Sequence, residues 1–153
     1  MSNLDDLYRE IILDHYRSPR NRGELESPPA IRVEGFNPLC GDEIVVYLDI
    51  EDNVLKNIKM TGTGCSISQS SASLMSAAVK GKPLEQVREI IATFKELMTV
   101  HESTLAHDDE PAKVDLRALG ELAALQGVVK FPVRIKCATL SWNTMIQGLD
   151  EVA

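Results

Sequence analysis

The sequence predicts an α+β domain in which a three-stranded antiparallel sheet carries about five helices, most of them packed on one face. Three observations predict this class. Apolar residues recur at helical spacing over residues 4–16, three short runs rich in β-branched residues follow, and helical patterns then return. A length of 153 residues suits one domain, and no internal repeat indicates a second. We therefore expect residues 1–153 to form a single domain.

The N-terminal part predicts a helix followed by a surface loop. Residues 4–16 have the helical period, and Ser2 or Asn3 is available as the N-cap. Residues 17–29 contain three prolines, a glycine and several charges, which is typical of an exposed connection.

Three strands are predicted next, at residues 31–36, 43–50 and 54–61. The last two runs are rich in Ile, Val, Leu and Tyr, residues that favour extended structure. The acidic residues 51–53 between them are typical of a hairpin turn. The three strands should therefore form a small antiparallel meander.

The rest of the chain is predicted to be mainly helical. Helices are expected over residues 65–80, 83–98, 116–125 and 133–149, the third of them ending at Gly127. Residues 99–113 are polar, acidic and aperiodic, and we predict an exposed loop there.

Composition excludes several classes of function. The net charge is −7, from 16 basic and 23 acidic residues, and no basic stripe interleaved with aromatics is present, so nucleic acid is a poor partner. No apolar run approaches the roughly 20 residues that span a bilayer, so no membrane association is expected. The first predicted helix is acidic and does not resemble a secretion signal. The default expectation is a cytoplasmic protein, in which thiols stay reduced or bind metal.

Three cysteines lie far apart in the chain, and their settings suggest metal binding. Cys65 is predicted at a helix N-terminus, where the helix dipole favours a thiolate, and Cys137 follows two basic residues with the same effect. Three thiolates with Asp42, two residues after Cys40, would suit a tetrahedral zinc ion. Their spacing matches no compact zinc-finger pattern, so three buried small hydrophobic residues remain the alternative.

The segments around these cysteines resemble a known family. NPLCGD (37–42), GTGCSIS (62–68) and FPVRIKCATLSW (131–142) occur in the order found in the U-type iron–sulfur cluster assembly proteins, and LYREIILDHYRSPRN (7–21) extends the similarity. The chain resembles the SufU branch most closely. The resemblance implies a SufE/NifU-like fold, the NifU N-terminal domain, with the three cysteines meeting at one exposed end.

The resemblance also implies roles for individual residues. It makes Cys40, Asp42, Cys65 and Cys137 the ligands of a zinc ion and Cys40 the acceptor of persulfide sulfur from a cysteine desulfurase of the SufS type. Sulfur would then pass to the SUF cluster assembly complex, which makes the chain a zinc-dependent sulfurtransferase. Arg134 is expected near the site, where it could hold Asp42 when the ligands rearrange.

Two departures distinguish branches of the family. Scaffolds of the IscU type have a histidine directly before the third cysteine, whereas Lys136 stands there in this chain. Residues 130–134 do not form the proline-rich chaperone signal of that type, so a dedicated chaperone partner is not expected. Residues 99–127 resemble the insertion of the SufU branch.

Other functions remain open at this level. The same thiolates could hold a transient iron–sulfur cluster in a true scaffold, or a purely structural zinc in a binding module. A Cys–His hydrolase would need His101 or His107 near a cysteine, and no motif places them there. His15 lies on the apolar side of the first helix and is predicted to be a packing residue.

Overall fold

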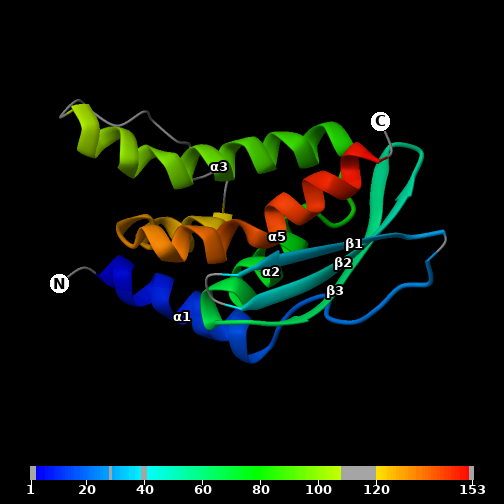
Figure 1. Cartoon of the computed structure of the whole chain (residues 1–153), viewed down its shortest axis with the longest axis horizontal. Coiled ribbons are helices and arrows are strands. Elements are labelled where there is room, and N and C mark those ends of the chain that lie inside the picture. Colours follow the sequence, from blue (N-terminus) through cyan, green and yellow to red (C-terminus); the bar gives the residue numbers. More distant parts are fainter. Residues whose placement is uncertain (1–2, 28, 39–40, 108–119, 152–153) are drawn as a thin grey trace.

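The computed structural model describes residues 3–27, 29–38, 41–107 and 120–151, and it confirms the α+β class (Figure 1). An N-terminal helix leads into a three-stranded sheet, and the remaining helices follow it in the chain. In chain order the elements are α1 (Asn3–Arg17), β1 (Ile31–Asn37), β2 (Asp42–Glu51), β3 (Val54–Thr63), α2 (Ser66–Val79), α3 (Leu84–His107), the 3-10 helix η1 (Gly120–Lys130) and α5 (Pro132–Asp150).

The sheet is the predicted antiparallel meander, in the order β1-β2-β3. Asn37 pairs with Asp42 at one end of β1 and β2, and the strands continue in register from there. Asp52 and Asn53 join β2 to β3 with φ angles of 53° and 61°. Two consecutive residues with positive φ are typical of the type I′ hairpin turn, whose twist matches that of the flanking strands.

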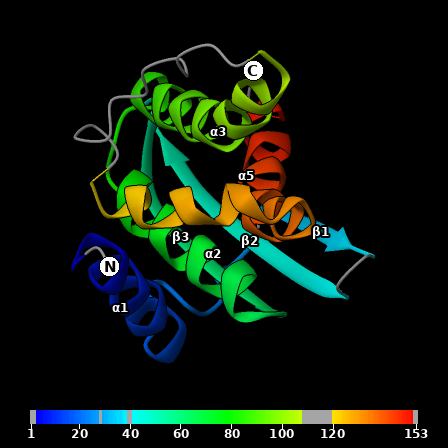
Figure 2. The same ribbon diagram turned by 90° about the vertical axis from the view of Figure 1, so that its left-hand side faces the viewer.

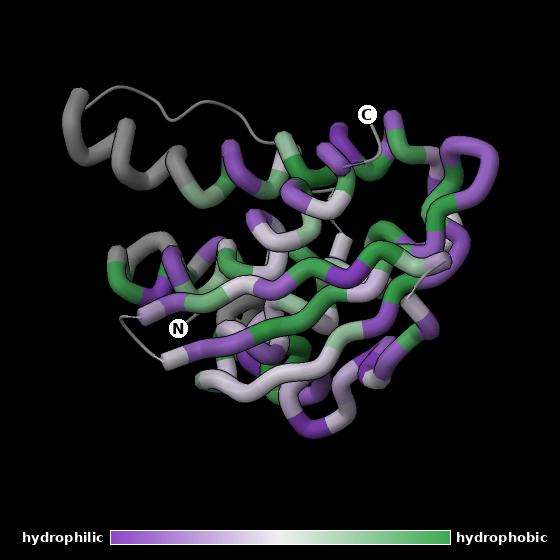
Figure 3. The backbone as a smooth tube through the Cα atoms, turned by 45° about the vertical axis from the view of Figure 1, so that its right-hand side comes forward, coloured by the Kyte–Doolittle hydropathy of each residue, from purple (hydrophilic) through white to green (hydrophobic). Residues whose placement is uncertain are grey.

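The helices of the described residues lie on one side of the sheet, as predicted for most of them: α2, α3 and α5 contact strands, and α1 packs on α2 and η1. Figure 2 shows them gathered on that side, with η1 and the start of α5 crossing in front of α2. In Figure 3 the tube of β2 is hydrophilic at its start and hydrophobic along its middle, where it enters the core. The rings of Phe94 of α3 and Trp142 of α5 stack with centroids 4.0 Å apart.

The segment after α1 covers part of the opposite face and the edge of β3. Gly23 N donates to Met60 O (2.9 Å), and Met60 N donates to Asn21 O (3.0 Å). The hydroxyl of buried Tyr47 donates to Glu24 Oε1 (3.3 Å). An edge strand that would otherwise expose unpaired backbone groups is thereby partly paired.

The prediction of a loop over residues 99–113 is wrong for its first part. α3 continues to His107 without interruption, while residues 108–113 lie outside the described ranges. Extending an existing helix adds a hydrogen bond per residue without a new nucleus, so a polar segment free of Gly and Pro can stay helical. None of the helices in the described ranges is long and apolar enough to cross a membrane.

The helix predicted over residues 116–125 also differs from the structure. Residues 120–130 form the 3-10 helix η1, which passes Gly127 instead of ending there, and residues 116–119 lie outside the described part. Buried Leu122 and Leu125 place this short helix against the core. Packing of these apolar side chains therefore holds a backbone conformation that local sequence signals do not specify.

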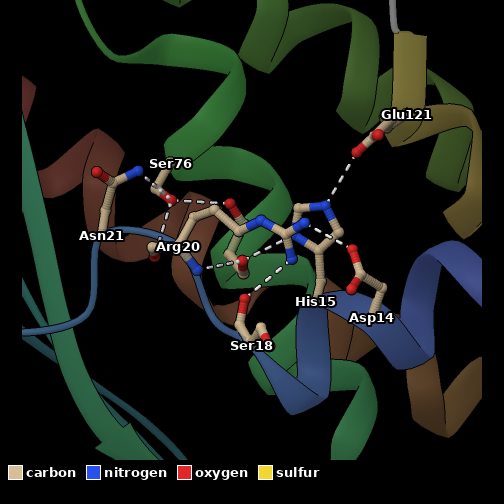
Figure 4. A network of polar contacts seen from close by, with 8 residues as sticks. Asp14, His15, Ser18, Arg20, Asn21, Ser76 and Glu121 are labelled. Carbon is tan, nitrogen blue, oxygen red and sulfur yellow. Dashed lines mark hydrogen bonds and ion pairs between the residues drawn. The ribbon is translucent and has the colours of Figure 1, made fainter.

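His15 is buried, as predicted, and it also joins three elements through hydrogen bonds (Figure 4). Its Nε2–H donates to Glu121 Oε2 of η1 (2.9 Å), and Nδ1 lies 2.7 Å from Ser73 Oγ of α2. Arg20 N donates to the same Ser73 oxygen (2.8 Å). The Arg20 guanidinium donates to Asp14 and holds the pKa of that exposed carboxyl below its ordinary value. This polar connection fixes α1 against α2 and η1.

Candidate metal centre

Asp42 is the first residue of β2 and points to the helix-covered face of the sheet. Side chains of a strand alternate between faces, and Asp42 shares its face with buried Ile44 and Val46. Gly41 precedes it with a φ of 71°, and Gly41 N donates to Asn37 O (2.8 Å), which closes the turn. The Asp42 carboxylate is fully buried. Burying a carboxylate is costly unless it is hydrogen-bonded or bound to a cation.

Cys65 lies where β3 gives way to α2, as the sequence predicts. It is the N-cap of α2, and its Sγ accepts a hydrogen bond from Ser68 N (3.4 Å). Its own N–H donates to Asp42 Oδ1 (2.9 Å). The sulfur therefore sits at the positive end of the helix dipole, and the backbone of the same residue anchors the carboxylate.

Cys137 lies in the second turn of α5 and is fully buried. Pro132 occupies the first turn of this helix, where its missing N–H breaks no helical hydrogen bond. The thiol donates to Val133 O one turn earlier, at 3.8 Å. Cys137 therefore lies within the helix that the sequence predicts over residues 133–149.

These three side chains converge at one point. One carboxylate oxygen of Asp42 and the sulfur atoms of Cys65 and Cys137 all lie within 4.8 Å of one another. Neighbouring ligand atoms around a tetrahedral zinc ion are about 3.3–3.8 Å apart, so small side-chain movements would complete such a site. Two sulfur donors and one carboxylate also match the ligand types that zinc prefers. The donor set therefore fits a zinc ion.

Two other predicted site residues stay untested. Cys40 lies outside the described residues, so its position as fourth ligand stays a prediction. Arg134 lies three residues before Cys137 on α5 and is exposed, and its role also stays a prediction. The described part of the chain holds no histidine in this group of ligands, and His15 contacts Ser73 and Glu121 instead.

Asn37 is a site residue that the sequence did not reveal. Its buried Nδ2 group donates to Asp42 Oδ2 (3.4 Å) and to Cys137 Sγ (3.7 Å). The amide thus orients two candidate ligands at once, as partners behind a metal site commonly do. One signal in the sequence could have indicated that Asn37 is buried. It follows Val33 and Gly35 at alternate positions of β1, which face inward.

Comparisons with known proteins show which family the chain resembles. The model of the NifU-like N-terminal domain family matches residues 7–138. The zinc-dependent sulfurtransferase SufU of Bacillus subtilis is 44% identical over 150 residues, which cover 98% of this chain and 94% of that protein.

Two further relatives are named as scaffolds. The iron–sulfur cluster assembly scaffold protein IscU of Streptococcus pyogenes is 35% identical over 153 residues, covering 100% of this chain and 89% of that protein. A solved structure from Fervidobacterium islandicum, described as a cluster assembly scaffold protein for the SUF system, superposes with a TM-score of 0.78. It is 28% identical, and the match covers 92% of this chain and 94% of that one.

Proposed function

Because the chain belongs to the NifU-like N-terminal domain family of iron–sulfur cluster assembly proteins, we propose that it is a zinc-bound acceptor of persulfide sulfur. The sulfur donor would be a cysteine desulfurase of the SufS type, and the receiving system a SUF-type assembly complex. The observation that carries this proposal is the convergence of Asp42, Cys65 and Cys137 at one point, where Asp42 and Cys137 are buried and Cys65 is half-buried. The name of the Bacillus subtilis relative agrees with it.

Asp42, Cys65 and Cys137 would hold the ion, and Cys40 would supply the fourth ligand. Cys40 is two residues before Asp42 in the chain. When bound, zinc stabilises thiolates without changing oxidation state itself. The Asn37 amide orients Asp42 Oδ2 and the Cys137 sulfur through its hydrogen bonds, and Cys65 N holds Asp42 Oδ1 in place. The chain therefore supplies both the ligands and the groups that orient them.

A substitution at Gly64 should test the placement of Asp42. A Cβ atom at Gly64 would lie 2.6 Å from Asp42 Oδ1, closer than real contacts allow, so Gly64→Ala should push the carboxylate out of position. We expect the affinity for Zn²⁺ to fall about ten-fold, measured by competition with a chelating dye. Thr63→Ala, at the exposed neighbouring residue, is the control and should bind as the parent does. Equal affinities for both variants would contradict this role of Asp42.

The proposed transfer is a thiol–persulfide exchange that needs no added oxidant or reductant. The Cys40 thiolate would attack the terminal sulfur of the desulfurase persulfide. A new S–S bond forms at Cys40, the S–S bond on the desulfurase breaks, and its electron pair leaves with the desulfurase thiolate. The terminal sulfur keeps its proton during the transfer, so Cys40 ends as the persulfide.

Arg134 would support this exchange. Asp42 has buried oxygens that already accept hydrogen bonds from Cys65 N and the Asn37 amide. When the ligands rearrange, a guanidinium could pair with the carboxylate in the bidentate geometry that arginine favours. The exposed position of Arg134 on the first turns of α5 leaves its long side chain room to turn toward the site.

The surface at this end suits a protein partner. Phe36, Phe131 and Val133 are large hydrophobic residues that are 58%, 61% and 58% exposed. Phe36 directly precedes Asn37, and Val133 O accepts the hydrogen bond from the Cys137 thiol. Exposed apolar residues around a reactive site are typical of a surface that is covered when a partner binds.

A second candidate function is that of a true cluster scaffold. The specific observation in its favour is the thiolate-rich donor set, since sulfur ligands accept iron in clusters as well as zinc. The Streptococcus pyogenes relative carries the name of such a scaffold. In that case the iron–sulfur cluster is the cargo held on the same residues.

One experiment separates these functions. The purified full chain is analysed for metal, then incubated with a SufS-type desulfurase and cysteine and examined by intact-mass spectrometry. We expect one zinc ion per chain and a mass increase of one sulfur atom. A zinc protein that never gains sulfur and unfolds on chelation would support a structural site instead. Anaerobic loading with iron and sulfide, followed by rapid transfer to an apo-acceptor, would support the scaffold.

A further inference from the structure

The serine-rich sequence of α2 has buried hydroxyl groups along its length. Such groups destabilise a protein unless they find hydrogen-bond partners, so the partner of each serine reports what the helix is attached to. The buried serines of this helix are Ser68, Ser70, Ser71, Ser73 and Ser76. Ser73 and Ser76 connect to the segment around Arg20, whereas Ser70 donates within α2 to Ser66 O.

Ser71 differs from the others because it connects α2 to α5. Its hydroxyl donates to Ala138 O at 2.6 Å and accepts from Trp142 Nε1 at 3.0 Å. Ser71, Ala138 and Trp142 are all completely buried. One hydroxyl therefore uses both its donor and its acceptor capacity on the same neighbouring helix, away from competing water.

This bridge lies between the two helices that carry the cysteine ligands. Ser71 is six residues after Cys65, about 9 Å along the helix axis. Its acceptor, Ala138 O, belongs to the residue after Cys137. Any shift of α2 along α5 would change the separation of the two sulfur atoms and would also break the bridge.

We propose that Ser71 is a positioning residue for the metal centre: its bridge to Ala138 and Trp142 sets the separation of Cys65 and Cys137. The inference rests on the proposed zinc site. Zinc binding requires ligand distances within about 0.2 Å of their ideal values, and apolar contacts between two helices define such a position less sharply than directional hydrogen bonds. The bridge supplies this directional restraint between the two helices, next to Cys137 and about 9 Å along α2 from Cys65.

The test compares Ser71→Ala with two controls in the full-length protein. Ser70→Ala removes an equally buried hydroxyl that bonds only within α2. Val79→Ala destabilises the far end of the same helix by removing buried apolar atoms. Affinity for Zn²⁺ is measured by chelator competition, and the absorption spectrum of the Co²⁺-loaded protein reports the geometry of its ligands.

We expect the Zn²⁺ dissociation constant of Ser71→Ala to rise about ten-fold, with a changed Co²⁺ thiolate spectrum. Both controls should stay within about two-fold of the parent, even where their thermal stability falls. Equal affinities and spectra for Ser71→Ala and Ser70→Ala would overturn the proposal, as would a weakening in Val79→Ala as large as that in Ser71→Ala.

A second variant covers the case in which Ser71→Ala does not fold. Trp142→Phe removes one hydrogen bond of the bridge and keeps an aromatic ring beside Phe94. We expect its affinity to fall by about three-fold, with the same direction of spectral change, and an unchanged Co²⁺ spectrum would overturn the proposal. A parent chain that binds no zinc would refute the proposed function and this inference together, whereas tight binding by the parent and by Ser71→Ala would refute the inference alone.

Discussion

Cys40→Ala should abolish transfer of sulfur from the desulfurase to this chain. The terminal sulfur of the persulfide must form its new S–S bond with a thiolate, and the proposal assigns that bond to Cys40 alone. We expect no mass increase of one sulfur atom after incubation with desulfurase and cysteine. The rate at which this chain takes sulfur from the desulfurase should fall at least about 100-fold, because the proposal assigns the acceptor role to the Cys40 thiol and not to Cys65 or Cys137.

The loss of a ligand must be separated from the loss of the acceptor thiol. Metal analysis of Cys40→Ala is the control, since a variant that still holds zinc through Asp42, Cys65 and Cys137 and gains no sulfur has lost only the acceptor thiol. Peptide mapping of the parent should locate the added sulfur on Cys40. If Cys40→Ala gains sulfur on Cys65 or Cys137 at the parental rate, the assignment of the acceptor is wrong.

Cys137→Ala should nearly eliminate zinc binding. The thiol is fully buried beside the Asn37 amide, so no water or external ligand can easily take its place. Structural zinc sites with four ligands bind with roughly 10–16 kcal/mol, and losing one ligand should weaken binding at least about 100-fold. Chelator competition on the purified variant measures this loss directly.

Ser141→Ala is the matched control for that substitution. Ser141 is buried on α5 one turn after Cys137, and within the described residues its hydroxyl has no hydrogen-bond partner. Removing this hydroxyl should leave the zinc affinity unchanged and the fold at least as stable. Tight zinc binding by Cys137→Ala would show that the convergence of the three side chains does not form the metal site.

The sheet and most helices could be predicted because their signals are local. β2 is one residue longer at each end than the strand predicted at 43–50, and β3 is two residues longer at its end than the strand predicted at 54–61. The turn at Asp52 and Asn53 likewise follows from two adjacent residues that tolerate positive φ. Alternation of side chains and turn chemistry depend on neighbours in sequence, so they can be recognised without knowledge of the fold.

The region after residue 98 shows where local signals fail. The polar character of 99–107 indicated a loop, but the segment continues α3, and η1 passes Gly127 as a 3-10 helix. Whether a segment extends a helix or leaves it depends on the element before it and on packing against distant residues. The polarity of a segment indicates neither the preceding element nor the packing.

The sequence by itself determined the order of strands and helices, the chemistry of Cys65 at a helix start, and, through its motifs, the family of the chain. Only the tertiary structure decided that Asp42 meets Cys65 across 23 residues, and that Asn37 reaches Cys137 across 100. The bridge from Ser71 to α5 belongs to the same group of contacts. The physical reason is that periodicity shows which face of an element is buried, while the packing of α2 and α5 on the sheet selects its neighbours.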